Sequence, residues 1–270
     1  MRAVDQWRVR PGETVRLDRR DPASVAGAPG DKTATEQATL PLHEELFGIQ
    51  DRLWAESTHS VLVVLQGLDA SGKDGTIKHV FRGVNPQGTN VASFKQPTPE
   101  EQAHDFLWRV HRRTPAAGEI AIFNRSHYED VLVVRVHGLA PEKVWRARYD
   151  EINAFERLLA RGGTTTVKFF LHVSFEEQGR RLRDRLERPD KRWKARAADF
   201  LERGHWDAYQ RAYTEAIEKT STDVAPWYVI PADHKWYRNW AVSQVLLATL
   251  EEMAPRYPDP PPPDLPDGVT

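Results

Sequence analysis

An uninterrupted run of five aliphatic residues at positions 61–65 limits most strongly how this chain can fold. A strand with aliphatic side chains at every position has no polar face, so it must be covered on both sides, as in the middle of a parallel sheet. Weaker apolar runs occur at 90–94, 119–123, 167–173 and 227–230, separated by segments long enough for helical crossovers. We therefore predict an α/β fold in which helices cover both faces of a central parallel sheet.

The segments between these runs carry helix signals. Thr98 and Glu101 form a capping box around Pro99, which predicts a helix that continues through Val110. Apolar residues at helical spacing predict a second helix over 145–159, ended by Gly162. Further helices are expected over about 42–55, after the phosphate-loop motif at 77–82, and over 235–253.

The two ends of the chain lack such periodicity. Residues 1–40 mix Pro, Gly, Asp, Thr and Arg, which predicts an irregular arm. Residues 255–270 contain seven of the nineteen prolines and are expected to form an extended tail. We assign neither end to the core and place a single domain over 41–254.

Composition excludes several classes of protein. No apolar run approaches the roughly 20 residues that cross a bilayer, and residues 1–10 contain three Arg without the apolar core of a signal peptide. We expect a cytoplasmic protein with no membrane partner. Because the chain has no Cys, it cannot form disulfides, thiolate nucleophiles or Cys-ligated metal centres.

The total charge hides a local concentration of cations. The chain has 38 Lys and Arg against 39 Asp and Glu, a net charge of −1, which argues against a general nucleic-acid binder. Between residues 180 and 196, however, nine cations face three anions. This segment is either a solvated basic helix face or a mobile lid whose arginines close over phosphate, and we favour a lid spanning about 180–203.

A phosphate-binding motif follows the strongest strand directly. Gly67, Gly72 and Lys73 have the G-x-x-x-x-G-K spacing, and a helical segment comes next. The glycines let backbone N–H groups turn toward phosphate oxygens, and the lysine reaches the terminal phosphates. The candidate phosphate-binding residues of this loop are Gly67, Ala70, Ser71, Gly72, Lys73, Asp74, Gly75 and Thr76.

The loop departs from the common form in its carboxylates. Asp74 stands where most such loops place Ser or Thr, and Asp69 adds a second acid. Two carboxylates would repel a bare phosphate, but they suit Mg²⁺ that bridges to the substrate. For Asp74, a helix cap is an equally good interpretation; for Asp69 we favour the metal.

A second polar segment follows the strand at 119–123. Parallel strands end at one edge of the sheet, so this segment is expected beside the phosphate loop. Glu129 or Asp130 would complete a metal site with Asp69, while Arg125 would meet a phosphate. For His127 we favour a hydrogen-bonded supporting role over catalysis.

Four ordered motifs resemble those of the polyphosphate kinase 2 family over about residues 42–253. They are the loop at 67–73, the Asn124–Asp130 segment, the Pro189-Asp190-Lys191-Arg192-Trp193-Lys194 stretch and the segment 225–236. The resemblance implies a P-loop kinase fold like that of thymidylate kinase, in three layers with a helical lid. It also implies reversible phosphoryl transfer between inorganic polyphosphate and nucleotides, with Mg²⁺, or Mn²⁺ in its place.

The resemblance assigns roles as well. It implies that Lys73 and lid arginines contact phosphate, that Asp69 and an acid of the second motif bind magnesium, and that Lys95 borders a polyphosphate channel. The segment around Glu129 resembles members that accept both AMP and ADP. We therefore expect a polyphosphate:AMP/ADP phosphotransferase that transfers phosphoryl groups directly, without a covalent enzyme intermediate.

The full set of candidates is as follows. The candidate catalytic residues are Asp69, Lys73, Arg125, Glu129, Asp130, Arg180, Arg185 and Arg188. Additional phosphate ligands are Lys95, Lys191 and Lys194; nucleotide ligands are Asn124, Arg125, Asp130 and Arg185; metal ligands are Asp69, Glu129 and Asp130. The expected partners are polyphosphate and AMP, ADP or ATP, without nucleic acid, in a homodimer or homotetramer.

Without the family resemblance, the residues leave two alternative functions open. The loop and lid would equally serve an ATP-dependent kinase of a nucleotide or another small molecule. The basic segment, with Trp193 and Trp206 to stack on bases, would serve a nucleic-acid-binding module.

Overall fold

The computed structural model of the protein describes residues 3–259 and contains a six-stranded sheet in the order β1-β6-β5-β2-β4-β3. The strands are β1 Arg8–Val9, β2 Ser60–Gln66, β3 Thr89–Ser93, β4 Ile120–Asn124, β5 Thr164–His172 and β6 Trp227–Pro231. Strands β3, β4, β2, β5 and β6 pair in parallel, and β1 is antiparallel to β6. The predicted α/β fold and its five parallel strands are confirmed, with β2 buried at every position.

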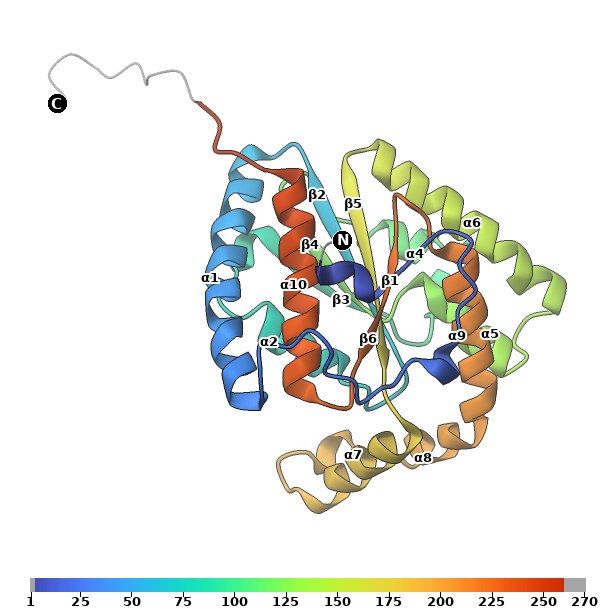
Figure 1. The fold of residues 1–270 in the computed structure, drawn as a ribbon. Coiled ribbons are helices and arrows are strands. Elements are labelled where there is room, and N and C mark those ends of the chain that lie inside the picture. Colours follow the sequence, from blue (N-terminus) through green and yellow to red (C-terminus); the bar gives the residue numbers. More distant parts are fainter. Residues whose placement is uncertain (1–2, 260–270) are drawn as a thin grey trace, which may run out of the picture.

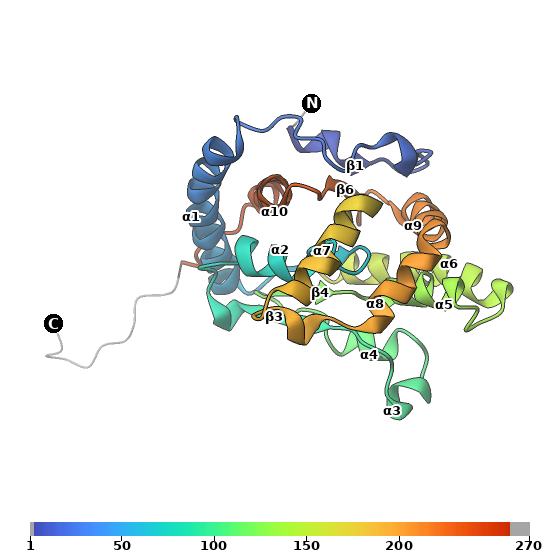
Figure 2. The same ribbon diagram turned by 90° about the horizontal axis from the view of Figure 1, so that it is seen from below.

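Helices cover both faces of this sheet (Figures 1 and 2). The helices are α1 Lys32–Glu56, α2 Lys73–Val80, α3 Pro99–Gln102, α4 Trp108–His111, α5 Val133–Val136, α6 Glu142–Arg161, α7 Phe175–Glu187, α8 Ala197–Glu202, α9 Trp206–Thr220 and α10 Lys235–Met253. Helices α1, α2 and α10 pack over one face, and α5, α6 and α9 over the other. No helix of residues 3–259 is long and apolar enough to cross a membrane.

The carboxyl ends of the parallel strands lie at one edge of the sheet. Strand β2 leads into the loop before α2, β4 into a short 3₁₀ helix His127–Asp130, and β5 into α7. Helices α7 and α8 lie beyond this edge, at the bottom of Figure 1. The parallel topology therefore brings the two predicted motifs and the basic segment together, as expected for ligand sites in open α/β sheets.

The prediction of an irregular arm over residues 1–40, outside the core, is wrong in two respects. Helix α1 begins at Lys32, where Asp31 caps it by accepting from the Ala34 N–H at 2.9 Å, and it continues through Pro41. The arm before it adds β1 to the sheet and buries Trp7. The sequence pattern predicted neither the start of α1 nor strand β1. The first turns of α1 are polar, and the buried residues of the arm are isolated in the sequence and do not form a periodic apolar face.

The helix predicted after Thr98 is also shorter than expected. The capping box is present, but α3 has four residues and none of them is buried. Asp105 accepts from the Leu107 N–H at 2.9 Å, which starts a new turn ahead of α4. Without an apolar contact to extend it, α3 ends early. Most of the predicted Pro-rich tail lies outside the described residues.

The contacts of the arm predict a large stability effect of Trp7→Ala. Trp7 is 3% exposed and packs edge-on against Tyr237 and Trp240, with ring centroids 6.2 and 5.6 Å away. We expect the free energy of unfolding to fall by about 3–5 kcal/mol, since a large buried side chain leaves a cavity. Urea denaturation measures this, with Trp193→Ala as the control because Trp193 is 77% exposed. Equal small losses in both variants would contradict burial of the arm.

Candidate active site

The loop between β2 and α2 has the backbone of a phosphate cradle. Ala70 and Gly72 adopt positive φ values of 63° and 110°, which turns the chain sharply before the first turn of α2. Lys73 is buried, and its ammonium donates to the carbonyls of Gly67 at 2.6 Å and Leu68 at 3.2 Å. The Ser71 hydroxyl is buried without a hydrogen-bond partner among the described residues. The loop thus holds an unused donor beside a buried cation.

Asp69 and Glu129 are joined by one guanidinium. Arg125 donates from Nη2 to Asp69 Oδ1 at 2.6 Å and from Nη1 to Glu129 Oε2 at 3.2 Å. Burial opposes ionisation of Asp69, but Arg125 and Lys73 outweigh it and lower the pKa of the carboxyl. Arg125 itself has a φ of 62°, in the left-handed region. The segment after β4 therefore reaches the phosphate loop, as predicted. In this structure, Arg125 pairs with two carboxylates, whereas the sequence predicted a contact with phosphate.

Asp130 faces a different environment from its neighbour Glu129. Its carboxylate lies 3.4 Å from Arg148 Nη1 and 3.8 Å from Arg109 Nη2. Burial raises the pKa of Asp130 to about 6, although both arginines lower it. The charged groups that act on Asp130 are Arg148, Arg109 and Glu129, whereas Glu129 shares Arg125 with Asp69. Of the two candidate acids, Glu129 is therefore the one placed toward the loop.

A buried network holds the 3₁₀ helix that carries these acids. Lys168 on β5 donates to Glu156 at 2.6 Å and to the Tyr128 hydroxyl at 2.8 Å. His127 Nε2 lies 3.3 Å from Glu156 and the ring is fully buried. His127 therefore sits away from solvent in a supporting position.

Asp74 connects the loop to two other segments. Its carboxylate accepts from Asn124 at 2.9 Å and from Lys194 at 2.9 Å. The N-cap of α2 is Gly72, so Asp74 serves here as a link rather than as the cap. Lys194 thus ties the predicted lid to the phosphate loop.

The cations of the lid divide into two groups. Besides Lys194, Arg185 is close enough to lower the pKa of Asp69, and it pairs with Asp199 at 3.1 Å. The remaining candidates pair within or next to the lid: Arg180 with Glu177, Arg188 with Asp190 and Lys191 with Asp184. Lys95 is exposed after β3. The structure brings Arg185 and Lys194 to the site and leaves the others on the surface around it.

A cavity opens beside the Asp69–Arg125–Glu129 triplet. Its lining includes Gly67, Gln178 and Glu202, and one wall is aromatic, formed by Trp206, Tyr209 and Tyr213 at the start of α9. The sequence analysis did not place Tyr209 and Tyr213 in the site. Their spacing of four residues indicates that they share one face of α9. The spacing does not indicate which part of the protein that face contacts.

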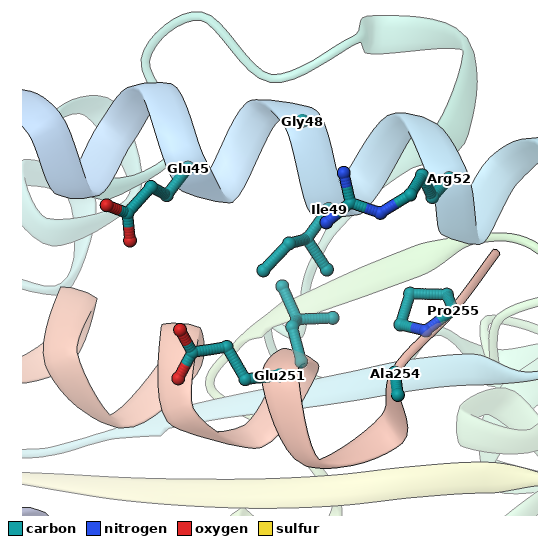
Figure 3. A pocket seen from close by; sticks show the side chains of 8 residues that line it. Glu45, Gly48, Ile49, Arg52, Glu251, Ala254 and Pro255 are labelled. Atoms are coloured by element: carbon teal, nitrogen blue, oxygen red, sulfur yellow. The ribbon is translucent and has the colours of Figure 1, made fainter.

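A wider hollow of about 420 Å³ lies between α1 and α10 (Figure 3). It is lined by Glu45, Arg52 and Glu251 among smaller or apolar residues, and none of the predicted site residues borders it. Its two carboxylates make it a poor match for phosphate. The candidate site is therefore the cavity at the loop.

The triplet fits a magnesium ion. Mg²⁺ in proteins uses one or two carboxylates and completes its shell with phosphate oxygens and water. Asp69 and Glu129 provide two carboxylates that already share a cation, Arg125. Among the described residues, no group of three or more His, Cys, Asp or Glu is placed to hold a metal ion.

The environment of Lys73 predicts a pH dependence. Burial and Arg125 lower the pKa of the ammonium to about 8, against the pull of Asp69 and Glu129. If the charged form binds phosphate, kcat/KM for the phosphate donor falls above about pH 8. Between about pH 8 and pH 10.5, the Lys73 side chain carries more of its proton in the unfolded chain than in the folded protein. The contribution of Lys73 to the free energy of unfolding therefore rises with pH in this range. A pH–rate profile that stays flat to about pH 10 would contradict the assignment.

The strand β2, the phosphate loop and the helix α2 belong to a P-loop kinase-like α/β fold. Residues 30–258 match the family model for polyphosphate kinase 2, and the chain belongs to that family. The predicted resemblance is confirmed, and with it phosphoryl transfer between polyphosphate and nucleotides; the alternative, an ATP-dependent kinase of a nucleotide or another small molecule, is not favoured.

Individual relatives agree along nearly the whole chain. It is 55% identical over 257 residues to the AMP/ADP-polyphosphate phosphotransferase of Meiothermus ruber, covering 95% of this chain and 96% of that one. It is 43% identical over 266 residues to the ADP-polyphosphate phosphotransferase of Rhodopseudomonas palustris, covering 94% and 92%. The crystal structure of polyphosphate kinase 2 from Arthrobacter aurescens superposes with a TM-score of 0.92 at 42% identity, covering 97% of this chain and 92% of that chain.

Proposed function

We propose that this chain transfers phosphoryl groups reversibly from inorganic polyphosphate to AMP and to ADP, in a reaction that requires Mg²⁺. The observation that carries the proposal is the meeting of Asp69, Arg125 and Glu129 at one cavity. The buried ammonium of Lys73 lies close enough for these three groups to act on its pKa. The name of the Meiothermus ruber relative, 55% identical, supports both acceptors.

The two substrates would approach this cavity from different sides. The loop at 67–76, with the Lys73 ammonium and the unused Ser71 hydroxyl, would hold the terminal phosphates of polyphosphate. The part-exposed ring of Trp206 would border the nucleoside, because aromatic faces stack on bases of any sequence. Tyr209 and Tyr213 are buried behind it and would support this wall. Asn124, which donates to Asp74, and Arg185, which lowers the pKa of Asp69, would then lie near the nucleotide phosphate.

Catalysis would depend on charge and position. Asp69 and Glu129 would hold Mg²⁺, which would supply positive charge against the reacting phosphates. Arg125, Arg185 and Lys73 would stabilise the charge that spreads over the transferring group, and the lid would exclude water. Phosphoryl transfer between two phosphates needs no strong base, so a direct in-line reaction without a covalent enzyme intermediate is sufficient.

The choice of acceptor is tested by incubating the protein with polyphosphate, Mg²⁺ and either AMP or ADP, and separating the nucleotides. The proposal predicts ADP from AMP and ATP from ADP. Product from only one of the two acceptors would contradict dual specificity.

The different surroundings of Glu129 and Asp130 predict different effects of removing each charge. Glu129→Gln should lower kcat by about a hundredfold and raise the Mg²⁺ concentration needed for half-maximal rate, since it loses a metal ligand. Asp130→Asn, one residue away, should change kcat by about tenfold at most and leave the Mg²⁺ requirement unchanged. Steady-state kinetics against Mg²⁺ measure both, and the reverse order would assign the metal to Asp130.

A cytoplasmic location, replacement of Mg²⁺ by Mn²⁺ and assembly into a homodimer or homotetramer stay predictions. Gel filtration with light scattering would determine the oligomeric state. Measuring the rate with each metal in turn would test whether Mn²⁺ replaces Mg²⁺.

A further inference from the structure

Side chains hold five successive backbone carbonyls of the phosphate loop. Lys73 takes the carbonyls of Gly67 and Leu68, and Gln178 donates to that of Asp69 at 3.0 Å. Arg181 donates to Ala70 at 3.1 Å and to Ser71 at 2.9 Å. The contacts from Gln178 and Arg181 come from α7, which follows β5, so a second strand fixes the loop that follows β2.

Arg238, on α10, also reaches one of these carbonyls, that of Ser71. It is 2% exposed, and its Nη1 donates to the Ser71 carbonyl at 3.3 Å. A Cβ atom on Gly72 would lie 1.8 Å from this nitrogen, and one on Gly75 would lie 3.2 Å from Nη2. Two glycines of the motif thus leave room for a guanidinium behind the loop as well as for phosphate in front of it.

The carbonyl contacts set the direction of an N–H group. In a trans peptide, the C=O and N–H bonds point in opposite directions. Because Arg181 and Arg238 both hold the Ser71 carbonyl, the N–H of Gly72 points away from the two guanidiniums. Phosphate-binding loops depend on N–H groups turned in this way.

Arg238 is also buried without a carboxylate. Among the described residues, its side-chain hydrogen bonds go to the Ser71 carbonyl and to Asn239 Oδ1, the latter at 2.8 Å. The charged side chains coupled to it electrostatically are the cations Arg181 and Lys235. Burial, and secondarily Arg238, lower the pKa of the neighbouring His79. Burial, and secondarily Arg181, lower the pKa of the Arg238 guanidinium to about 9. A buried charge without an opposite partner is destabilising, which calls for a compensating anion.

We propose that Arg238, together with Arg181, is a positioning residue for polyphosphate: the two guanidiniums orient the loop from behind and supply positive charge that the bound phosphate chain balances. Neither needs to touch the phosphate. The effect of Arg238 would therefore fall on the affinity for the donor and not on the nucleotide. The proposal rests on the proposed binding of polyphosphate at this loop.

Arg238→Met tests it, because Met keeps much of the volume and removes the charge and the donors. Calorimetric titration with inorganic polyphosphate should show affinity reduced by about tenfold or more. The KM for the nucleotide should stay within about twofold, and the melting temperature without phosphate should be unchanged or higher. Unchanged affinity for polyphosphate would overturn the proposal, whatever the melting temperature does.

Two further variants separate this role from a structural one. Arg135→Met removes a half-buried arginine paired with Glu215 at 2.6 Å, so it should lower the melting temperature and leave polyphosphate affinity unchanged. If Arg238→Met is itself destabilised, Arg238→Lys, which retains the charge, must recover most of the affinity; failure to do so would also overturn the proposal. If the unmodified protein does not bind polyphosphate, the proposed function fails first.

Discussion

Lys73→Met should reduce phosphoryl transfer by about a thousandfold or more while the protein stays folded. The ammonium is buried at the turn of the loop and is the cation closest to its carbonyls. Methionine retains the length of the side chain but places no positive charge against the terminal phosphates. Folding should not suffer, because the lowered pKa of Lys73 shows that burial disfavours its charged form. Initial rates with polyphosphate and ADP measure the loss.

Lys78→Met provides the matched control. Lys78 lies on the same helix, α2, and is exposed, so its replacement should leave the rate within about twofold. Near-normal turnover of Lys73→Met, or equal losses in the two variants, would remove Lys73 from the site.

Asp69→Asn should lower kcat by about a hundred- to a thousandfold and raise the Mg²⁺ concentration required. Asparagine is similar in shape and keeps an oxygen for Arg125, so the loop retains its contact at 2.6 Å. What is lost is the negative charge that would bind the metal. Mn²⁺ binding, followed by electron paramagnetic resonance with polyphosphate present, gives a readout independent of turnover.

Asp190→Asn is the control for Asp69→Asn, because Asp190 is an exposed lid carboxylate paired with Arg188. It should leave both Mn²⁺ affinity and kcat unchanged. If Asp69→Asn stays active and needs no more Mg²⁺ than the unmodified protein, Asp69 is not a metal ligand.

The elements of the fold could be predicted from sequence wherever burial is periodic. The aliphatic run in β2 and the amphipathic pattern of α6 identified them within a few residues. Strand β1 could not be predicted, since a two-residue strand has no period and pairs with β6, far along the chain. Helix α3 shows that a local cap does not set helix length: Thr98 starts the helix, and the absence of a buried face ends it.

Some residues of the site could likewise be predicted from local sequence, and others could not. The loop residues from Gly67 to Lys73 follow from a local motif, and parallel topology predicts that Arg125 comes near them. Glu129 faces the loop, while Asp130 faces Arg109 and Arg148. This difference depends on how the 3₁₀ helix that carries both acids is anchored by Lys168 and Glu156. Sequence spacing cannot distinguish adjacent acids of that kind.

Arg238 was outside the sequence prediction for a similar reason. It lies 167 residues from Ser71 in the chain, on a helix that was predicted from the sequence without any role in the site. Only the pairing of β6 with β5 brings α10 behind the loop. A long-range contact to a backbone carbonyl leaves no motif in the sequence.

The identity of the phosphoryl donor is the most direct test of the whole account. Purified protein is incubated with AMP, Mg²⁺ and terminally labelled polyphosphate in the absence of ATP, and the nucleotides are separated over time. The account predicts that label appears in ADP and then in ATP, and that Lys73→Met abolishes it. Label that stays in polyphosphate, with ADP formed only when ATP is supplied, would contradict it.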